Sequence, residues 1–344
     1  MKAAWFDSFG DANKVFQIGV QPKPAVGEGQ VLIKLATSGV NPSDVKKRAG
    51  AFSNLLDDGL IIPHSDGAGI IEEVGQGINE SRIGERVWIY QAQYGRRFGT
   101  SAEYIAIDSN RAILLPINTD FSIGACLGIP AMTAHRCVHA DGDIEGQILL
   151  ITGGAGRVGY YAIQWAVMAG AKVIATASNS SDQQLCLSLG ATAVVNHNDN
   201  DWGQQVSEAI NGEKVHRVID VEFGANLPNI LSCIATGGVI ATYSSTQVRA
   251  PSIPFLDMMY KDLTLRMVIV YAMPEKAKML ATEDITRALE IGTLKHRVAH
   301  TLPLEEISEA HKLIESGKVK GCVCLLYTSP SPRDATLSRM PSSA

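Results

Sequence analysis

A glycine-rich segment, GGAGRVG (Gly153–Gly159), has the residue spacing that most clearly predicts chemistry in this sequence. It contains the pattern GxGxxG at Gly154, Gly156 and Gly159. A continuous apolar run precedes it and an apolar pattern of helical period follows it, which favours a dinucleotide-binding loop over a plain turn of an unliganded α/β domain. We expect Gly154 to allow a tight turn, Gly156 to let the backbone approach a pyrophosphate, and Gly159 to let the helix pack closely. The amides and the dipole at the helix start favour phosphate there.

The residues at the end of the next predicted strand (Lys172–Ser178) bear on the choice between NADH and NADPH. Proteins that bind NAD usually carry Asp or Glu there, about 20 residues after the loop, for the ribose 2′-hydroxyl. Here Ser178 is followed by Asn179 and Ser180. Asp182 is nearby, but an acid is expected in the first turn of a helix for the helix's own stability. The sequence therefore favours NADPH, although no Arg or Lys stands in this loop to neutralise a 2′-phosphate.

The elements around the loop follow an α/β pattern. The first part of the chain is predicted to be β-rich, and a helical segment follows at Ala125–Val138. From Gln147 onward apolar strands alternate with helices, which implies a parallel sheet covered on both faces. The apolar run Leu263–Met273 is predicted to form a further strand. At 344 residues the chain is longer than one core usually serves, so we expect two domains.

Composition and charge exclude several classes of partner. The net charge is −5 without a long run of like charge, so neither nucleic acid nor an anionic membrane is an expected partner. The six cysteines form no CxxC pair and no disulfide framework, which favours a reducing compartment. The first residues lack the apolar run of a signal peptide, and no stretch of 18 apolar residues occurs. These features predict a cytoplasmic protein.

The segment Cys324–Ala344 differs abruptly from the rest of the chain. It is rich in Ser, Pro, Arg and Thr without periodicity, as natural disordered tails are. Along its whole length it also resembles the read-through translation of a transposase-type sequencing adaptor. We therefore expect it to be disordered and without a functional role. On that interpretation the natural last strand is interrupted near Val323, and Cys324–Leu326 fills its place by accident.

Further segments resemble the zeta-crystallin-like quinone oxidoreductase branch of the medium-chain dehydrogenase/reductase superfamily, which lacks zinc. The segments that carry the resemblance are Gly39–Gly50, Pro63–Gly75, Gly84–Trp88, Gly153–Ala166, Leu189–His197 and Leu302–Gly321. The resemblance implies a GroES-like β-rich catalytic domain beside a Rossmann domain with a doubly wound parallel sheet, and NADPH as the usual donor. It implies the catalytic domain in residues 1–123 and again in 265–323, the Rossmann domain in 124–264, and the disordered tail in 324–344.

The resemblance also implies which residues contact the cofactor. Those residues are Thr133 on the nicotinamide side; Gly154, Ala155, Gly156, Arg157, Val158 and Gly159 in the pyrophosphate loop; Ser178 beside the 2′-phosphate; His197 near the adenosine; Asn226; Ala241, Thr242, Tyr243 and Ser244 beside the ribose and nicotinamide; and Arg266, Met267 and Val268, whose backbone holds the carboxamide. Asn41 and Lys46 are implied at the cleft wall. Lys46 departs from the Tyr that the family often has, which leaves its role open.

A catalytic zinc, which the alcohol dehydrogenases of this superfamily bind, is not expected here. Such a site needs three soft or imidazole ligands and an open position. Asn41 occupies the slot of the first ligand, a Cys, and Ser65 occupies the slot of the ligand His. His64 is one residue out of place, which turns its side chain to the other face of a strand. We expect His64 to be a hydrogen-bonded or rim histidine, although a place in the cleft stays open.

Without a Lewis acid the acceptor must already be electrophilic, as quinones and α,β-unsaturated carbonyls are. Catalysis then rests on proximity and orientation, with polar groups to stabilise the developing anion. Asn41, Lys46 and Tyr90 are the candidate substrate-cleft residues, with no proton-transfer role assigned. A half-buried strand position explains Tyr90 equally well. Arg96 and Arg97 suit an anionic acceptor, but a solvated loop face is the slightly better interpretation.

Three functions stay open at this point. The first is an NADPH:quinone reductase (EC 1.6.5.-), and the second is a reductase of alkenals, enones or enoyl thioesters on the same scaffold. The third is a non-enzymatic NADPH-binding or RNA-associated protein, which the acidic balance supports little. The resemblance further implies a homodimer in which an edge strand at 265–273 pairs with its partner, since an exposed apolar edge is otherwise an aggregation hazard.

Overall fold

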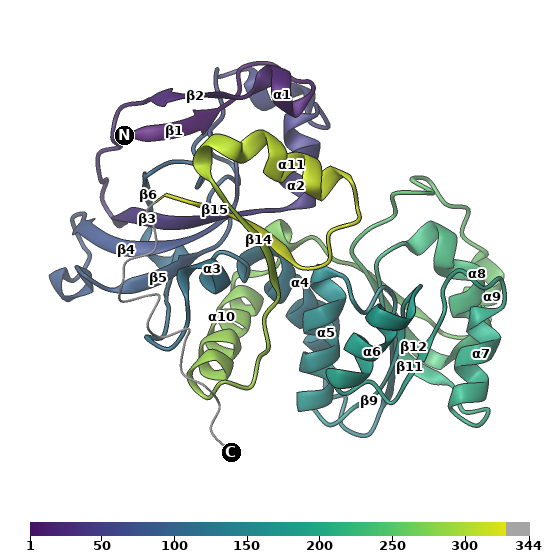
Figure 1. Cartoon of the computed structure of the whole chain (residues 1–344). Coiled ribbons are helices and arrows are strands. Elements are labelled where there is room, and N and C mark those ends of the chain that lie inside the picture. The colour runs from purple at the N-terminus through teal and green to yellow at the C-terminus, as the bar shows by residue number, and fades with distance from the viewer. Residues whose placement is uncertain (328–344) are drawn as a thin grey trace. The chain divides into compact units, whose positions relative to one another are not determined.

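The computed structural model describes residues 1–327, which fall into two compact units (Figure 1). One unit joins Met1–Ile129 with the segment that begins at His296, and the other is the continuous stretch Pro130–Lys295. No helix among residues 1–327 combines the length and the apolarity that a membrane span needs.

A six-stranded parallel sheet forms the centre of the continuous unit. Its strands are β8 (Ile148–Ile151), β9 (Lys172–Thr176), β10 (Ala193–Val195), β11 (Val215–Asp220), β12 (Ile234–Thr242) and β13 (Thr264–Met267). They lie in the order β10-β9-β8-β11-β12-β13, and every neighbouring pair is parallel. Numbered from β8, this is the order 3-2-1-4-5-6 of doubly wound dinucleotide-binding sheets. The predicted α/β class is confirmed.

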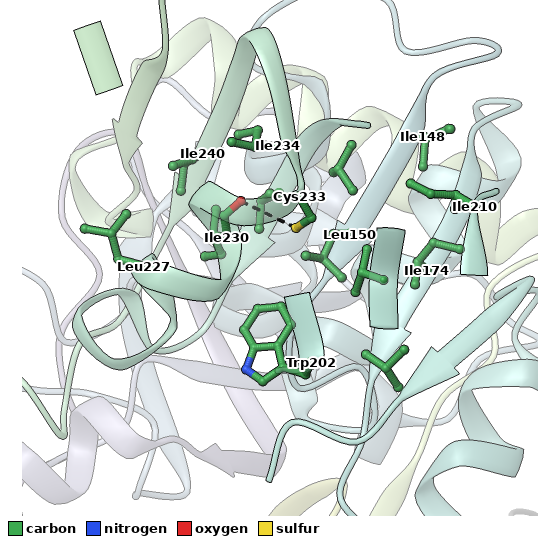
Figure 2. Packing of buried hydrophobic residues seen from close by; sticks show 14 of the residues in the cluster. Ile148, Leu150, Ile174, Trp202, Ile210, Leu227, Ile230, Cys233, Ile234 and Ile240 are labelled. Carbon is green, nitrogen blue, oxygen red and sulfur yellow. Dashed lines mark hydrogen bonds between the residues drawn. The ribbon is translucent and has the colours of Figure 1, made fainter. Parts of the chain in front are cut away.

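Helices connect these strands and bury them. The helices are α4 (Gly128–His139), α5 (Arg157–Met168), α6 (Ser180–Ser188), α7 (Trp202–Ala209), α8 (Phe223–Cys233), α9 (Phe255–Tyr260) and α10 (Glu275–Glu290). All four residues of β8 are buried, as expected for a central parallel strand. Figure 2 shows part of the resulting core, in which Ile148, Leu150 and Ile174 of the sheet belong to one apolar cluster with residues of α7 and α8.

The discontinuous unit is β-rich. Its strands are β1 (Lys2–Trp5), β2 (Gln17–Val20), β3 (Gln30–Val40), β4 (Asp66–Val74), β5 (Arg86–Ile89), β6 (Tyr104–Asp108), β7 (Ala112–Leu114), β14 (Val298–Pro303) and β15 (Cys322–Leu326). Seven of them form a sheet of order β14-β15-β3-β4-β5-β7, with β6 also paired to β3, while β1 and β2 form a separate pair. The helices are α1 (Ala12–Val15), α2 (Pro42–Arg48), α3 (Phe121–Gly124) and α11 (Ile307–Glu315). β15 lies beside β3, far from it in sequence (Figure 1).

The observed units differ from the expected boundaries at 123 and 264. The stretch 124–129 groups with the β-rich unit, where Ile129 N–H donates to the Asp66 carboxylate at 2.9 Å. The stretch 265–295 groups with the parallel sheet, and Asp284 of α10 accepts from His135 of α4 at 2.9 Å. Contacts that are distant in sequence decide both boundaries, and periodicity does not report such contacts.

The structure departs from one predicted strand and bears out another. The strand predicted at Leu263–Met273 is limited to Thr264–Met267, and Val270–Ala272 forms a 3₁₀ turn. Val270 and Tyr271 are buried in that turn, so burial rather than strand pairing explains the apolar run. Cys324–Leu326, at the start of the segment expected to be disordered, fills the place of the last strand as expected, within β15 and paired with β3 and β14. The remainder of that segment from residue 328 lies outside the described residues.

Candidate functional site

The glycine-rich loop joins β8 to α5 at the carboxyl edge of the parallel sheet. Gly156 is the residue that precedes the helix, and its carbonyl accepts the first helical hydrogen bond, from Tyr160 N–H at 2.8 Å. The backbone amides of the helical residues before Tyr160 therefore donate no hydrogen bond to a carbonyl of the helix itself. β8 and β11 are neighbours at the point where the strand order reverses, which is where ligands of doubly wound sheets bind.

The structure redistributes the glycine roles within this loop. The left-handed turn, expected at Gly154, lies at Gly153, whose φ is 61°. Gly154 is instead enclosed, because a Cβ there would lie 2.8 Å from Cys186 Sγ. Gly159 packs against backbone, with Gly153 O 2.4 Å from the position of a Cβ, as the close packing expected of it requires. Gly156 has more room than the other two. Among the described residues, and apart from its chain neighbours and the backbone of its own helix, a Cβ at Gly156 would come close only to Gly153 O, at 3.0 Å.

The end of β9 leads directly into the N-terminus of α6. Ser178 is half-buried there, and the side chain of Asn179 caps α6 by accepting from Asp182 N–H at 2.9 Å. The Asn179 amide also donates to the Asp182 carboxylate at 2.9 Å. Asp182 is buried and held by the helix cap, which agrees with the helix role expected for it. His197, after β10, lies beside the same strand end, since its Nδ1 is 3.2 Å from Thr176 Oγ1.

A buried carboxylate, Asp220, connects three strand ends at the carboxyl edge. Asp220 Oδ1 accepts from Thr152 Oγ1 and from Asn226 Nδ2, both at 2.8 Å, and Oδ2 accepts from Thr242 Oγ1 at 3.2 Å. Burial raises the pKa of Asp220, and the hydrogen bonds from Asn226, Thr152 and Thr242 oppose that shift. Sequence reasoning missed Asp220, although an acid at the end of the apolar strand RVID was a signal for it.

The other residues expected at the cofactor lie on β12, β13 and α4. Ala241 and Thr242 are buried at the end of β12, and Tyr243 and Ser244 follow it half-buried. Thr133 is buried within α4.

The Arg266–Val268 segment lies on the edge strand and just after it. The Arg266 side chain forms an ion pair with Asp141, and Val268 N–H donates to Thr242 O at 2.7 Å. The Arg266 side chain is thus held by Asp141. The backbone role expected of the Arg266–Val268 segment stays a prediction.

In the β-rich unit, Asn41 belongs to a buried polar cluster. Its Nδ2 donates to Asp66 Oδ2 at 2.8 Å, and its backbone N–H donates to Asp44 Oδ2 at 2.9 Å. Burial raises the pKa of Asp66 to about 8 and that of Asp44 to about 6. Gly128 lies directly against Asp66, because a Cβ there would be 2.2 Å from Asp66 Oδ1. The two acids were not singled out in the sequence.

Lys47 rather than Lys46 joins this cluster. Lys46 is exposed on α2, whereas Lys47 is buried and donates to both the backbone and the side-chain oxygen of Gln93, at 2.9 and 2.6 Å. Burial lowers the pKa of Lys47, and the charges of Asp44 and Asp66 oppose that shift. The place of Lys46 at a cleft wall stays a prediction.

The loop after β5 is held by its own hydrogen bonds. Tyr90 directly follows β5 and is buried, and its hydroxyl donates to Asn110 O at 3.2 Å, so its substrate role stays a prediction. Arg96 donates to Ala106 O at 2.5 Å, and Arg97 donates to Leu60 O at 3.1 Å. Both arginines thus stabilise the fold by binding carbonyls, instead of forming a purely solvated face.

His64 is fully buried in a chain of neutral polar groups. Its Nε2 is 2.9 Å from His311 Nε2, and its Nδ1 is 2.8 Å from Ser38 Oγ. Burial lowers its pKa to about 3, so the ring is neutral. His64 is therefore a hydrogen-bonded core histidine. Within residues 1–327 no three His, Cys, Asp or Glu side chains are grouped to hold a metal ion.

Comparison with known proteins agrees with this geometry. The family model for the alcohol dehydrogenase GroES-like domain matches residues 27–117, and the model for zinc-binding dehydrogenases matches residues 158–285. The quinone oxidoreductase of Sus scrofa is 30% identical over 306 residues, which cover 88% of this chain and 91% of that protein. The chain belongs to the quinone oxidoreductase family of medium-chain dehydrogenases/reductases. The GroES-like and Rossmann domains expected from the resemblance are thereby confirmed.

Other members of this superfamily are also similar. A 2-haloacrylate reductase of a Burkholderia species is 27% identical over 312 residues, covering 87% of this chain and 91% of that protein. The solved structure of an NAD-dependent alcohol dehydrogenase is 27% identical with a TM-score of 0.85, and covers 95% of this chain and all of that one. The quinone oxidoreductase of Escherichia coli, solved with NADPH, covers the same shares at a TM-score of 0.83 and 23% identity, which shows the fold. As a family member, the chain is an oxidoreductase.

Proposed function

We propose that this oxidoreductase uses NADPH to reduce a quinone and needs no zinc. The observation that carries the cofactor choice is the end of β9, where Ser178 stands in the place of a ribose-binding acid and Asp182 is occupied by the cap of α6. The Escherichia coli relative was solved with NADPH, which supports this choice, whereas a similar alcohol dehydrogenase is described as NAD-dependent. The cofactor therefore needs a direct test.

The residues of the parallel-sheet unit fit a dinucleotide. The start of α5 offers backbone amides to the pyrophosphate beside Gly156, where a side chain would intrude. The hydroxyls of half-buried Ser178 and of exposed Ser180 can donate to a 2′-phosphate, and neither residue repels its charge. His197 lies beside the same strand end and suits the adenosine side. Bound NADPH supplies the hydride, and these residues bind and orient it.

The acceptor needs to be electrophilic before it binds, because the usual zinc-ligand slots hold Asn41 and Ser65. The amide of Asn41 donates to Asp66, and Ser65 is buried. The chain's part in the reaction is then to align the acceptor and exclude water. Dialysis against a strong chelator should leave the rate of NADPH oxidation unchanged, and a loss that zinc restores would remove this part of the proposal.

A second acceptor class, α,β-unsaturated carbonyls, is favoured by the similarity to a 2-haloacrylate reductase. The two are separated by following NADPH oxidation with 1,4-benzoquinone, 9,10-phenanthrenequinone and trans-2-hexenal. Preferred turnover of a quinone supports the proposal, and preferred turnover of the enal replaces it with the second class. No turnover of any acceptor despite tight NADPH binding would favour the non-enzymatic alternative.

A homodimer through the edge of the parallel sheet is also proposed. β13 pairs only with β12 among residues 1–327, and its last residue Met267 and the nearby Ile269 are exposed at 70% and 57%. An apolar strand edge of this kind favours pairing with a second edge.

A further inference from the structure

The Asp220 carboxylate is fixed in place by two neighbouring strands. Thr152 directly follows β8, and its Oγ1 accepts from Val221 N–H at 3.0 Å, so its hydrogen is directed to Asp220 Oδ1. Thr242 ends β12 and donates to Asp220 Oδ2. Asp220 itself is the last residue of β11 and has no exposed surface. Both carboxylate oxygens of Asp220 are thus held by hydrogen bonds that do not involve α8.

Asn226, the fourth residue of the group that contains Asp220, Thr152 and Thr242, comes from a helix and not from the edge of the sheet. It lies on α8 and is half-buried, and its Nδ2 donates to Asp220 Oδ1 at 2.8 Å. The opposite orientation of the amide would place its carbonyl oxygen against the carboxylate, which is repulsive. The carboxylate therefore fixes which end of the amide faces away from it, and that end is the acceptor Oδ1.

We propose that Asp220 is a positioning residue that acts through Asn226, holding its amide so that Oδ1 accepts a hydrogen bond from a ribose hydroxyl of the bound dinucleotide. The inference rests on the proposed function, which places the cofactor at this edge of the sheet. A ribose hydroxyl is the matching chemistry, because it donates a hydrogen bond, whereas a phosphate oxygen accepts one. Asp220 itself makes no contact with the cofactor in this arrangement.

The test compares NADPH dissociation constants of four proteins by fluorescence titration. They are the wild type, Asp220→Asn, Asn226→Ala and the double variant. Each single variant should bind NADPH about tenfold more weakly, the effect of one lost hydrogen bond to a ligand. Because Asp220 acts through Asn226, the double variant should be no weaker than Asn226→Ala alone.

Thr282→Val is the matched control for stability. Thr282 is a buried residue of α10, whose hydroxyl donates to Met279 O at 2.8 Å, away from the carboxyl edge. It should lower the thermal midpoint without changing the dissociation constant. If Asp220→Asn also lowers only the midpoint and keeps the dissociation constant within twofold, Asp220 is merely structural and the inference is wrong.

Two further outcomes keep the inference separate from the proposed function. If Asp220→Asn does not fold, the half-buried Asn226→Asp replaces it, since two facing carboxylates repel and should release the side chain with the same tenfold loss. Unchanged binding by that variant overturns the inference. A wild type that binds neither NADPH nor NADH overturns the proposed function itself, before any variant is compared.

Discussion

Replacing Gly156 by alanine tests whether the start of α5 holds the pyrophosphate. The backbone of Gly156 is extended, with φ −72° and ψ 167°, so alanine adopts it without strain. The added Cβ would lie 3.0 Å from Gly153 O, which requires a shift of a few tenths of an ångström. Loss of a favoured residue at the helix N-cap costs about 0.5–1 kcal/mol. The thermal midpoint should therefore fall by only about 2–4 °C.

The effect on NADPH binding should be much larger. The methyl group occupies the space where the phosphates approach the amides of the loop, and loss of about two charge-assisted hydrogen bonds at ~1.5 kcal/mol each weakens binding on the order of 100-fold. Fluorescence titration with NADPH measures this loss. Asp11→Ala is the control, because Asp11 caps α1 of the other unit by accepting from Asn13 N–H at 2.9 Å. It should cost similar stability and no affinity.

The contrast with Gly159 sharpens the test. There a Cβ would meet Gly153 O at 2.4 Å and Gly154 Cα at 2.9 Å, both of them backbone atoms that cannot move aside easily. Gly159→Ala should therefore lower stability far more than Gly156→Ala. If Gly156→Ala binds NADPH within threefold of the wild type, the pyrophosphate does not lie at the start of α5 and the reasoning from the loop fails.

Three other predictions concern the cofactor, the buried acids and the sheet edge. Ser178→Asp should shift the ratio of kcat/KM for NADPH over NADH at least tenfold toward NADH, because a carboxylate repels a 2′-phosphate and accepts from a 2′-hydroxyl; an unchanged ratio would contradict the argument from β9. The pKa of Asp66, about 8, lies above its value of about 3.9 in an unfolded chain, so the folded protein keeps a proton that the unfolded chain releases, and stability falls as pH rises from about 4 to 8. In Asp66→Asn the thermal midpoint, measured by calorimetry, should therefore change less between pH 6.5 and 8 than in the wild type. An equally steep fall of the midpoint in the variant would show that Asp66 is already ionised in the folded protein. Met267→Lys should convert a dimer into a monomer in size-exclusion light scattering, whereas a wild type that is already monomeric would remove the proposed pairing of β13.

The local pattern of the chain predicted the strand, the glycine loop and the helix around Gly153–Gly159 well. Strand, glycines and helix are contiguous in sequence, so this arrangement can be recognised without reference to a distant residue. The exchange of roles between Gly153 and Gly154 could not be predicted, because the enclosure of Gly154 comes from Cys186 on α6. The same holds for Asp220, whose partners come from β8, β12 and α8.

The β-rich unit shows the limit of positional reasoning more clearly. Lys46 and Lys47 are neighbours on α2, and one helical step turns the side chain by about 100°, so a single position decides between solvent and the buried cluster. Burial on this helix depends on Gln93, which lies on a loop distant in sequence. The sequence singled out this helix but could not show that Lys47, and not Lys46, is the buried lysine.

The pairing of β15 with β3 has a consequence for synthesis of the chain. On the edge of β3 that faces away from β4, Gln30–Lys34 can pair with β6 early, but Thr37–Val40 finds its partner on that edge only when Val323–Leu326 has been made. At about 5–20 residues per second, this part of the strand edge waits on the order of tens of seconds beside the ribosome. The continuous unit Pro130–Lys295 has all its strands by then. Until β15 is made, this part of the β3 edge is thus open to chaperones and to mispairing.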